Sequence, residues 1–462
     1  MSKAPPLLLQ GIDTLVTMVD GAAPLSGVDL LIEGGRIAAI GRGLEAPPGT
    51  RVLDGANRVV YPGFVNTHHH LFQTLTRNLP RVHNAALFDW LLALYEIWRG
   101  LAPEAVEVST RVGIGELLLS GCTTTTDHFY LFPRGAPEEL LDVAIDTARE
   151  MGARFHPTRG SMSLGRSAGG LPPDDTTQTA DEILRDCERV IDKYHDPEPF
   201  SMCRVALAPC SPFSVTTDLL AGTAELARER GVRLHTHLAE TRDEEQFCLD
   251  THGMRPLDYM ATTGWLGEDV WYAHGIWFDD AEIARLAATG THVAHCPASN
   301  LRLGSGICKV PQLLDAGVNV GLAVDGSASN DASSMTREMQ LALLVHRVGT
   351  GVGAMPAQRV LRLATRGGAA LLGHDEIGRL EPGAAADLAV FRLDRVDFAG
   401  AMHEPATAIL YCGSGVRADA TIVAGRLLVE GGRLVGVDEG RLFHRANEVA
   451  AGLVRRADAA GR

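Results

Sequence analysis

The sequence predicts an α/β protein in which a large parallel barrel is joined to a small all-β domain. Three observations support this prediction. The chain has 462 residues, which is more than one typical domain requires. Between about residues 60 and 375, short apolar runs alternate with stretches of helical periodicity, a pattern typical of parallel β/α architecture. Both chain ends instead contain short β-prone runs separated by glycine turns.

The two chain ends resemble each other in pattern. Residues 14–19 and 28–32 are β-prone runs near the N-terminus, and residues 386–391 and 420–423 are similar runs near the C-terminus. The simplest interpretation is one small β-sandwich domain assembled from both chain ends, residues 1–62 and 376–462. The larger domain, residues 63–375, is then inserted between its two halves.

The inserted segment contains short apolar runs that can serve as barrel strands. We count eight of them, ending near Thr67, Asp127, Gly160, Pro209, His237, His274, Cys296 and Asp325. Helical periodicity lies between them, for example over residues 87–99 and 103–119. Eight such units predict a distorted (β/α)8 TIM barrel with insertions, because barrels of this type usually have roughly 250 residues.

Composition excludes several classes of partner. The formal net charge is −15, whereas nucleic acids and anionic membranes select for basic surfaces. The eight cysteines form no CxxC pair, which indicates reduced thiols in a cytoplasmic protein. The apolar run at residues 7–9 is too short for a signal peptide or a membrane span. We therefore expect a cytoplasmic protein that binds neither nucleic acid nor membrane.

Three consecutive histidines stand at the end of the first predicted barrel strand. Residues two apart on a strand point to the same side, so His68 and His70 can share one ligand while His69 points away. His235 stands two residues before His237 on the fifth strand. For His69 and His235 we expect packing or support of the ligands.

Other histidines and carboxylates follow the later strands. These residues are His237 and Glu240 at the fifth strand, His274 at the sixth and Asp325 at the eighth. The active sites of TIM barrels lie at the carboxyl ends of the strands. These side chains, together with His68 and His70, are therefore expected to converge on one point.

Several motifs taken together resemble the amidohydrolase superfamily. They are the Pro-Gly-Phe-Val-Asn-Thr-His-His-His run at residues 62–70, His-Thr-His-Leu-Ala-Glu at 235–240, Val-Asp-Gly-Ser at 324–327 and Gly-Ala-Ala-Ala-Asp-Leu at 383–388. The likeness extends over almost the whole chain and includes the split β domain. It implies an enzyme, whereas relatives that became non-catalytic scaffolds would be expected to have lost ligands.

The resemblance implies one metal ion held by His68, His70, His237 and Asp325. Three imidazoles and a carboxylate suit Zn²⁺, and Fe²⁺ is possible because ligand type alone does not separate the two. Binuclear members of the superfamily add a carboxylated lysine at the end of the fourth strand. Here that strand ends in Ala-Pro-Cys at residues 208–210. The only lysines of the chain are Lys3, Lys193 and Lys309, which predicts a mononuclear site.

The same resemblance implies catalytic roles for Glu240, His274 and Asp325. A bound zinc ion lowers the pKa of water toward 7 and so provides a nucleophile at neutral pH. Asp325 and His274 would accept or steer the water proton. Glu240 would protonate the ring nitrogen beside the attacked carbon, and general acid–base help of this kind contributes about 10²–10⁴-fold.

Within the superfamily, residues 68–77 and 88–91 resemble aminohydrolases that act on purines, pterins and triazines. Residues 161–165 and 208–212 most resemble the members that act on an oxidised purine, and this resemblance implies such a substrate. The expected reaction is zinc-dependent hydrolytic deamination of 8-oxoguanine to urate and ammonia. The alternatives are a deaminase of a pterin such as isoxanthopterin or of guanine, and a triazine amino- or chlorohydrolase.

Three residues are candidates for binding this small heterocyclic substrate. The Gln73 amide can pair with a ring carbonyl and the adjacent N–H, or it can be a surface or capping group. Trp90 can stack on a flat ring or belong to the core. Arg159, at the end of the third strand, can face a carbonyl or an anion, or pair with a carboxylate. We also expect a homo-oligomer, because barrels of this type are often dimers or tetramers.

Overall fold

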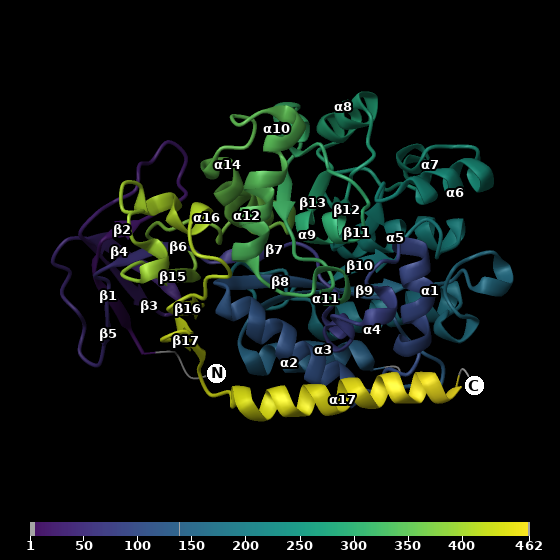
Figure 1. The fold of residues 1–462 in the computed structure, drawn as a ribbon, viewed down its shortest axis with the longest axis horizontal. Coiled ribbons are helices and arrows are strands. Elements are labelled where there is room, and N and C mark those ends of the chain that lie inside the picture. Colours follow the sequence, from purple (N-terminus) through teal and green to yellow (C-terminus); the bar gives the residue numbers. More distant parts are fainter. Residues whose placement is uncertain (1–4, 138, 461–462) are drawn as a thin grey trace.

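Eight parallel strands form the centre of the computed structural model, which describes residues 5–137 and 139–460 (Figure 1). They pair side by side in chain order, from β7 to β14. The Thr67 N–H donates to the Leu322 carbonyl at 3.1 Å, which brings the first and last strands together. The strands are β7 (Phe64–Asn66), β8 (Cys122–Phe129), β9 (Arg154–Ser161), β10 (Ala206–Pro209), β11 (Arg233–Leu238), β12 (Val270–His274), β13 (His292–His295) and β14 (Val320–Leu322).

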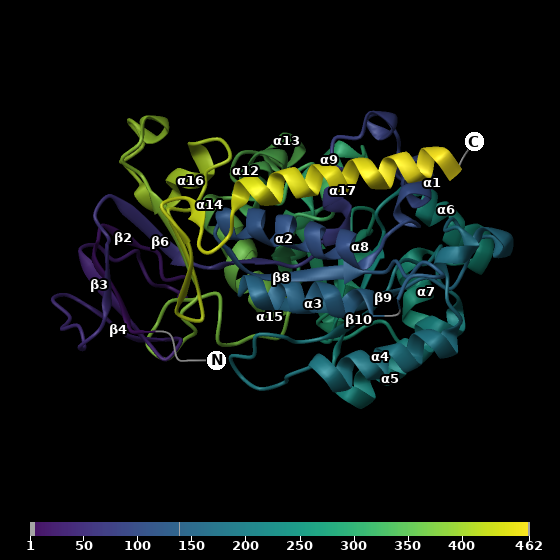
Figure 2. The same cartoon turned by 90° about the horizontal axis from the view of Figure 1, so that it is seen from below.

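Helices cover the outside of this barrel (Figures 1 and 2). The longer ones are α1 (Leu87–Trp98), α2 (Pro103–Leu119), α3 (Leu140–Met151), α4 (Ala180–Tyr194), α5 (Thr217–Arg230), α6 (Arg242–His252), α8 (Asp280–Thr289) and α12 (Met335–Val345). The shorter ones are α7 (Pro256–Thr262), α9 (Pro297–Arg302), α10 (Val310–Asp315), α11 (Ser327–Asn330), α13 (Arg347–Thr350), α14 (Ala357–Arg362), α15 (Gly368–Leu371) and α16 (Ala408–Tyr411).

Local sequence explains where several of these helices begin. In α4 the Thr179 side chain accepts a hydrogen bond from the Glu182 N–H, and the Glu182 side chain accepts one from the Thr179 N–H. Asp279 and Glu282 form the same reciprocal pair at the start of α8. This capping box satisfies N–H groups that have no partner within the helix. The helix α6 begins with the same residue spacing at Thr241 and Glu244, but only the Thr241 half of the box is formed.

Two further sheets lie to one side of the barrel and come from both ends of the chain (Figure 1). One sheet has the order β4-β3-β1-β5 and the other β18-β17-β16-β15-β6-β2. A shared apolar core that includes Leu9, Leu30, Leu388 and Ile422 joins them into a sandwich. Their strands are β1 (Leu7–Ile12), β2 (Thr14–Leu15), β3 (Val28–Glu33), β4 (Arg36–Gly41), β5 (Arg51–Asp54), β6 (Arg58–Pro62), β15 (Leu388–Arg392), β16 (Ala420–Val423), β17 (Arg426–Glu430) and β18 (Arg433–Leu434).

A buried ion pair connects the barrel to the sandwich. Arg154, the first residue of β9, donates to Asp387 Oδ2 at 2.9 Å, and both side chains are buried. The same guanidinium donates to the carbonyls of Phe200 and Ser201, while Asp387 Oδ1 accepts from the Ala424 N–H at 2.7 Å. Because a buried charge is tolerated only when it is paired and hydrogen-bonded, these contacts hold the two bodies in a defined arrangement.

The last helix, α17 (Glu439–Ala460), does not belong to the sandwich core. It runs along the outside of the barrel and packs on α1 and α2 (Figures 1 and 2). Val449 and Leu453, one turn apart, are its buried residues. The segment following residue 376 is therefore not wholly β-structured.

The predicted fold class is confirmed. A nearly closed barrel of eight parallel strands and a sandwich from both chain ends are both present. The strands end at most three residues from the expected positions, since β14 ends at Leu322 and β8 at Phe129. All eight cysteines are free. Within residues 5–137 and 139–460, no helix combines the length and apolarity needed to cross a bilayer.

Candidate metal centre and active site

The six residues expected to carry the chemistry meet at the carboxyl ends of the barrel strands. His68 and His70 follow β7, His237 lies in β11, His274 ends β12 and Asp325 follows β14. Glu240 follows β11 and lies near His274. Five of the six residues are buried, and His237 is partly buried. The convergence arises because parallel strands of a barrel end at one common face.

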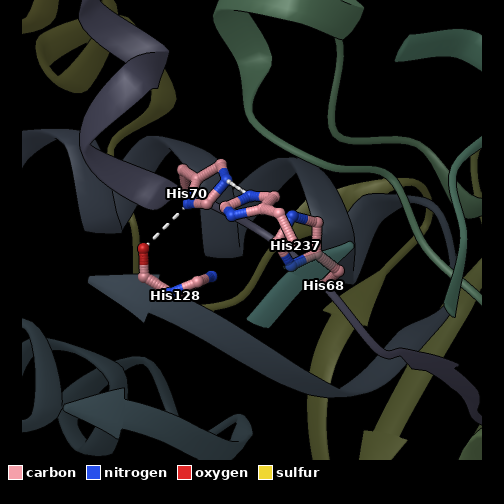
Figure 3. Close-up of side chains that lie close together, drawn as sticks. All are labelled: His68, His70, His128 and His237. Carbon is pink, nitrogen blue, oxygen red and sulfur yellow. Dashed lines mark hydrogen bonds between the residues drawn. The ribbon is translucent and has the colours of Figure 1, made fainter. Parts of the chain in front are cut away.

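Hydrogen bonds to main-chain carbonyls determine which ring nitrogen of each ligand carries the proton. His70 Nδ1 lies 2.8 Å from the His128 carbonyl (Figure 3). His237 Nδ1 lies 2.6 Å from the Cys210 carbonyl. A carbonyl can only accept, so Nδ1 donates in both rings and Nε2 keeps its lone pair. The two Nε2 atoms nevertheless lie only 3.1 Å apart.

His68 follows the same logic through another histidine. His235 Nδ1 donates to the Trp271 carbonyl at 3.0 Å, which leaves His235 Nε2 as an acceptor. His68 Nδ1 lies 2.7 Å from that atom and donates to it. His68 Nε2 is therefore also a lone pair, and it is buried without a hydrogen-bond partner among the described residues. His235 thus fixes the orientation of the His68 ring, which is a supporting role.

Asp325 completes the group of acceptors. Its Oδ1 lies 3.2 Å from His68 Nε2 and 3.3 Å from His70 Nε2. Its Oδ2 accepts from Ser299 Oγ at 2.5 Å and from Ser329 Oγ at 3.1 Å, so the carboxylate is held in one orientation. The backbone of Asp325 is left-handed, with φ 62°. A strained conformation of this kind is common at functional sites.

The donor set fits a metal ion. Three imidazole lone pairs and one carboxylate oxygen face one another in a buried site, which is unfavourable unless a cation lies between them. Tetrahedral zinc with Zn–N distances of about 2.0–2.1 Å would place its ligand nitrogens about 3.3 Å apart. The separations of 3.1–3.3 Å around His70 match that spacing. His68, His237, His274 and Asp325 also form a group that could hold an ion, as do His68, His70, His128 and His237.

Glu240 and His274 stand beside this group. Glu240 Oε2 lies 3.5 Å from His274 Nε2, which in turn lies 4.0 Å from Asp325 Oδ2. His274 Nδ1 donates to Asn300 Oδ1 at 2.9 Å and so presents Nε2 to the two carboxylates. Burial raises the pKa of Glu240 to about 7. Burial lowers the pKa of His274, but the carboxylates of Glu240 and Asp325 outweigh this effect and the net shift is upward.

A cavity opens against these residues at the carboxyl ends of the strands. It is lined by His70, Gln73, Leu87, Trp90, Leu91, Tyr130, Cys210, Phe213, His237, Glu240, His274, Leu303, Asp325 and Ser329. The lining combines His70, His237, Glu240, His274 and Asp325 with a larger share of apolar and aromatic side chains.

Two of the three predicted substrate-binding residues lie in this cavity. Gln73 belongs to a short 3₁₀ helix over Leu71–Thr76, is only 1% exposed, and its Oε1 has no hydrogen-bond partner among the described residues. Trp90 enters the cavity from α1, and its indole N–H is likewise buried with no partner in the described part of the chain. Both are polar atoms that a bound ring could satisfy.

Gly326 makes room for the Gln73 amide. A Cβ at residue 326 would come within 1.9 Å of Gln73 Oε1, so any larger residue there would displace this side chain. The glycine that follows Asp325 is thus required by close packing rather than by its backbone angles, since φ is −69°.

Arg159 lies elsewhere, and the substrate contact predicted for it does not fit. Its guanidinium donates to Asp186 Oδ2 at 2.6 Å and to Gln178 Oε1 at 2.9 Å, and it stacks on Phe132. It does not line the cavity described above. The alternative considered for it, pairing with a carboxylate, is what the structure contains, with Asp186 on α4 as the partner.

Several site residues were not expected from the sequence. His128 supports His70 through its carbonyl, and its ring stacks on His237 with centroids 4.8 Å apart. Tyr130, Cys210, Phe213 and Leu303 line the cavity. His128 directly follows Asp127, where the second strand was expected to end, and Tyr130 lies two residues further on, so their position was a usable signal. Phe213 and Leu303 lie on loops and carry no comparable pattern.

His69 points away from the metal-binding group, as the alternation along the strand predicts. Its Nε2 lies 3.0 Å from Ser333 Oγ, which is in turn 2.9 Å from Ser327 Oγ. This buried chain links the strand of His68 to the turn that follows Asp325, and it gives His69 a supporting role.

Comparisons with known proteins agree with this geometry. A model of the amidohydrolase family matches residues 59–428. An 8-oxoguanine deaminase of Pseudomonas aeruginosa is 49% identical over 427 residues, 92% of this chain and 94% of that protein. An isoxanthopterin deaminase from an unknown prokaryotic organism is 38% identical, covering 94% of both chains. The crystal structure of an atrazine chlorohydrolase from Arthrobacter aurescens TC1, complexed with zinc, superposes with a TM-score of 0.92 at 35% identity, covering 96% of this chain and 100% of that chain.

Proposed function

The chain belongs to the amidohydrolase family, and from this premise we propose that it hydrolyses 8-oxoguanine to urate and ammonia with one zinc ion per chain. Two of the relatives are deaminases, and the geometry of the site suits the same kind of reaction, hydrolytic deamination. One observation carries the proposal. Three imidazole lone pairs, the Asp325 carboxylate and the Glu240 carboxyl converge at one wall of a cavity whose other walls suit a flat ring.

We assign the metal to His68, His70, His237 and Asp325. When bound, the ion would provide a water molecule acidic enough to act as a nucleophile near neutral pH. Zinc is supported by the zinc-bound atrazine chlorohydrolase, and Fe²⁺ is the alternative for this ligand set. No lysine lies at the end of β10, where Pro209 and Cys210 stand, and this favours a single ion.

The acid–base groups have separate tasks in this proposal. Asp325 and His274 receive the proton of the attacking water. The two groups can share this task because His274 Nε2 lies 4.0 Å from Asp325 Oδ2. Glu240 carries a proton to the ring nitrogen beside the attacked carbon. Its pKa of about 7 suits this task, because a general acid is most effective when its pKa lies near the working pH. The proton that Asp325 and His274 took from the water then passes to the leaving amine, the hydroxyl proton of the adduct returns to Glu240, and ammonia departs.

Gln73 and Trp90 are proposed to recognise the ring. The Gln73 amide can accept from a ring N–H and donate to a ring carbonyl, and its buried Oε1 is available for this. The Trp90 indole can donate its N–H or stack on the ring. The alternative substrates are a pterin, guanine, and an amino- or chlorotriazine. The isoxanthopterin deaminase is the reason to include a pterin, and the atrazine chlorohydrolase is the reason to include a triazine.

We expect kcat/KM for 8-oxoguanine to exceed that for guanine by at least about tenfold. A site built to pair the extra carbonyl and N–H of the oxidised ring leaves its own buried groups unpaired when guanine binds. Gln73→Ala should lower kcat/KM for 8-oxoguanine without releasing the metal. Steady-state rates on both purines, with metal analysis of the variant, test this. Equal rates on the two purines would contradict the assignment of the substrate, as would turnover of a chlorotriazine but not of 8-oxoguanine.

Three broader assignments accompany the proposal. We propose residues 63–375 as the hydrolase domain and residues 1–62 with 376–462 as the β-sandwich domain. A homo-oligomer remains our prediction, and a small heterocycle is the partner that the cavity suits. A cytoplasmic location is proposed from the eight free cysteines alone.

A further inference from the structure

Glu244 is a fully buried carboxylate that the proposed reaction does not use. It lies in the first turn of α6, and its exposed fraction is 0%. Its Oε1 accepts from the Ala239 N–H and its Oε2 accepts from the Glu240 N–H, each at 2.9 Å. Both oxygens of the Glu244 carboxylate thus bind main-chain N–H groups. One N–H belongs to Glu240, to which we assign acid catalysis, and the other belongs to Ala239, the residue before it.

The hydrogen bonds of Glu244 differ from those that a Thr-x-x-Glu spacing usually forms at the start of a helix. Thr241 and Glu244 have the Thr-x-x-Glu spacing that forms a reciprocal capping box at Thr179 and Glu182 of α4. In α6 only half of that box is present, because the Thr241 side chain accepts from the Glu244 N–H at 3.3 Å. The Glu244 carboxylate reaches past the Thr241 N–H to the two preceding N–H groups. Capping of the helix therefore does not account for its position.

The main chain that Glu244 holds is strained. Ala239 has φ 54°, a left-handed conformation that costs an alanine free energy and that glycine adopts freely. The Ala239 carbonyl is also held, since it accepts from the N–H groups of Ile276 and Trp277 at 2.9 and 3.0 Å. Those residues follow His274 in the turn after β12. The strained peptide is thus fixed on one side by Glu244 and on the other by the turn that carries His274.

We propose that Glu244 is a positioning residue, whose buried carboxylate holds the strained Ala239–Glu240 main chain so that the Glu240 carboxyl faces the reacting ring. The inference rests on the role proposed above for Glu240. It accounts for the burial of a charged side chain, because each carboxylate oxygen is satisfied by a main-chain N–H that would otherwise be unpaired. Burial raises the pKa of Glu244 to about 6, and the two N–H donors limit this rise, so the ionised form prevails in assays at pH 8.

Glu244→Gln is the variant that tests the proposal. The amide keeps the size of the side chain but turns one acceptor into a donor that faces an N–H group, so one of the two hydrogen bonds is lost. A small displacement of a catalytic group is costly, and we expect kcat to fall about 10- to 100-fold. KM should change by less than about threefold because the ring contacts of Gln73 and Trp90 are untouched, and the metal content should stay at the wild-type level.

Glu182→Gln is the matched control. Glu182 occupies the same third position of a helix, but it caps the exposed start of α4 and contacts nothing in the cavity. Its kcat should stay within about twofold of wild type, as expected for a surface substitution. A Glu244→Gln variant with kcat within twofold of wild type would overturn the proposal, and so would one whose loss of activity is matched by loss of metal.

The double variant Ala239→Gly/Glu244→Gln keeps the test decisive if Glu244→Gln folds poorly. Glycine adopts the positive φ at residue 239 without strain, so the clamp is needed less. We expect the double variant to fold and to recover several-fold in kcat relative to Glu244→Gln, whereas no recovery would overturn the proposal. Glu240→Gln distinguishes failure of the proposed function from failure of this inference. If Glu240→Gln is fully active, the acid role of Glu240 is wrong. If Glu240→Gln is inactive while Glu244→Gln is fully active, only the positioning role of Glu244 is wrong.

Discussion

Replacing Glu240 by glutamine is expected to lower kcat for 8-oxoguanine by about 10²–10⁴-fold while one metal ion per chain remains bound. The neutral ring is a poor electrophile, so attack by water requires a proton to reach the ring nitrogen at the same time. Glutamine keeps the shape of the side chain and its place near His274, where Oε2 now lies 3.5 Å from Nε2, but it has no acidic proton to give. The three histidine lone pairs and Asp325 are unaffected.

Steady-state kinetics and metal analysis on the same preparation check this expectation. The unfolding midpoint should stay near that of the wild-type protein, because an amide of equal size fills the same buried position. If metal content falls in proportion to activity, Glu240 is a ligand and its assignment as the proton donor is wrong.

The second large effect is expected for His237→Ala, which should lose both the metal ion and measurable deamination. His237 Nε2 lies 3.1 Å from His70 Nε2, a spacing that suits two ligands of one tetrahedral ion. Loss of one of four ligands also leaves the remaining buried lone pairs facing each other. Second-sphere contacts alone change affinity about 10–100-fold, and loss of a ligand exceeds this.

His444→Ala provides the control for this substitution. His444 is exposed on α17 and does not line the cavity, so its removal should alter neither metal content nor rate. Metal analysis by mass spectrometry on wild type should give close to one ion of zinc or iron per chain. Two tightly held ions in the wild-type protein, or a full complement in His237→Ala, would contradict the proposed ligand set.

Much of the site could be predicted because strands impose strong geometric rules. His68 and His70 were expected on one side of their strand and His69 on the other, and the structure agrees because successive side chains alternate. The convergence of His237, His274 and Asp325 follows from the same rule applied to several parallel strands. Such predictions need only the ends of the strands, which apolar runs reveal.

The remaining features depend on packing that no local pattern encodes. Arg159 was predicted at a strand end, but Asp186 on α4 engages its guanidinium, and that partner is distant in sequence. Phe213 and Leu303 reach the cavity from loops. The helix α17 was missed because the β pattern at residues 386–423 was extended to the chain end, although the spacing of Val449 and Leu453 indicates a helix face.

The hydrogen bonds of the Glu244 carboxylate are the clearest feature that the sequence pattern does not predict. The Thr-x-x-Glu spacing at residues 241–244 predicts a capping box, as it does correctly at residues 179–182. The diversion of the carboxylate to residues 239 and 240 follows from the left-handed turn after β11, and only coordinates reveal that turn.

Identification of the products of 8-oxoguanine turnover tests the central claim most directly. Purified wild-type protein loaded with one zinc ion per chain should convert 8-oxoguanine into urate and ammonia in equal amounts, with both products measured in the same reaction. His237→Ala under identical conditions should release neither. Wild-type protein that holds its metal and forms no urate from 8-oxoguanine, yet releases chloride from a chlorotriazine, would contradict the account.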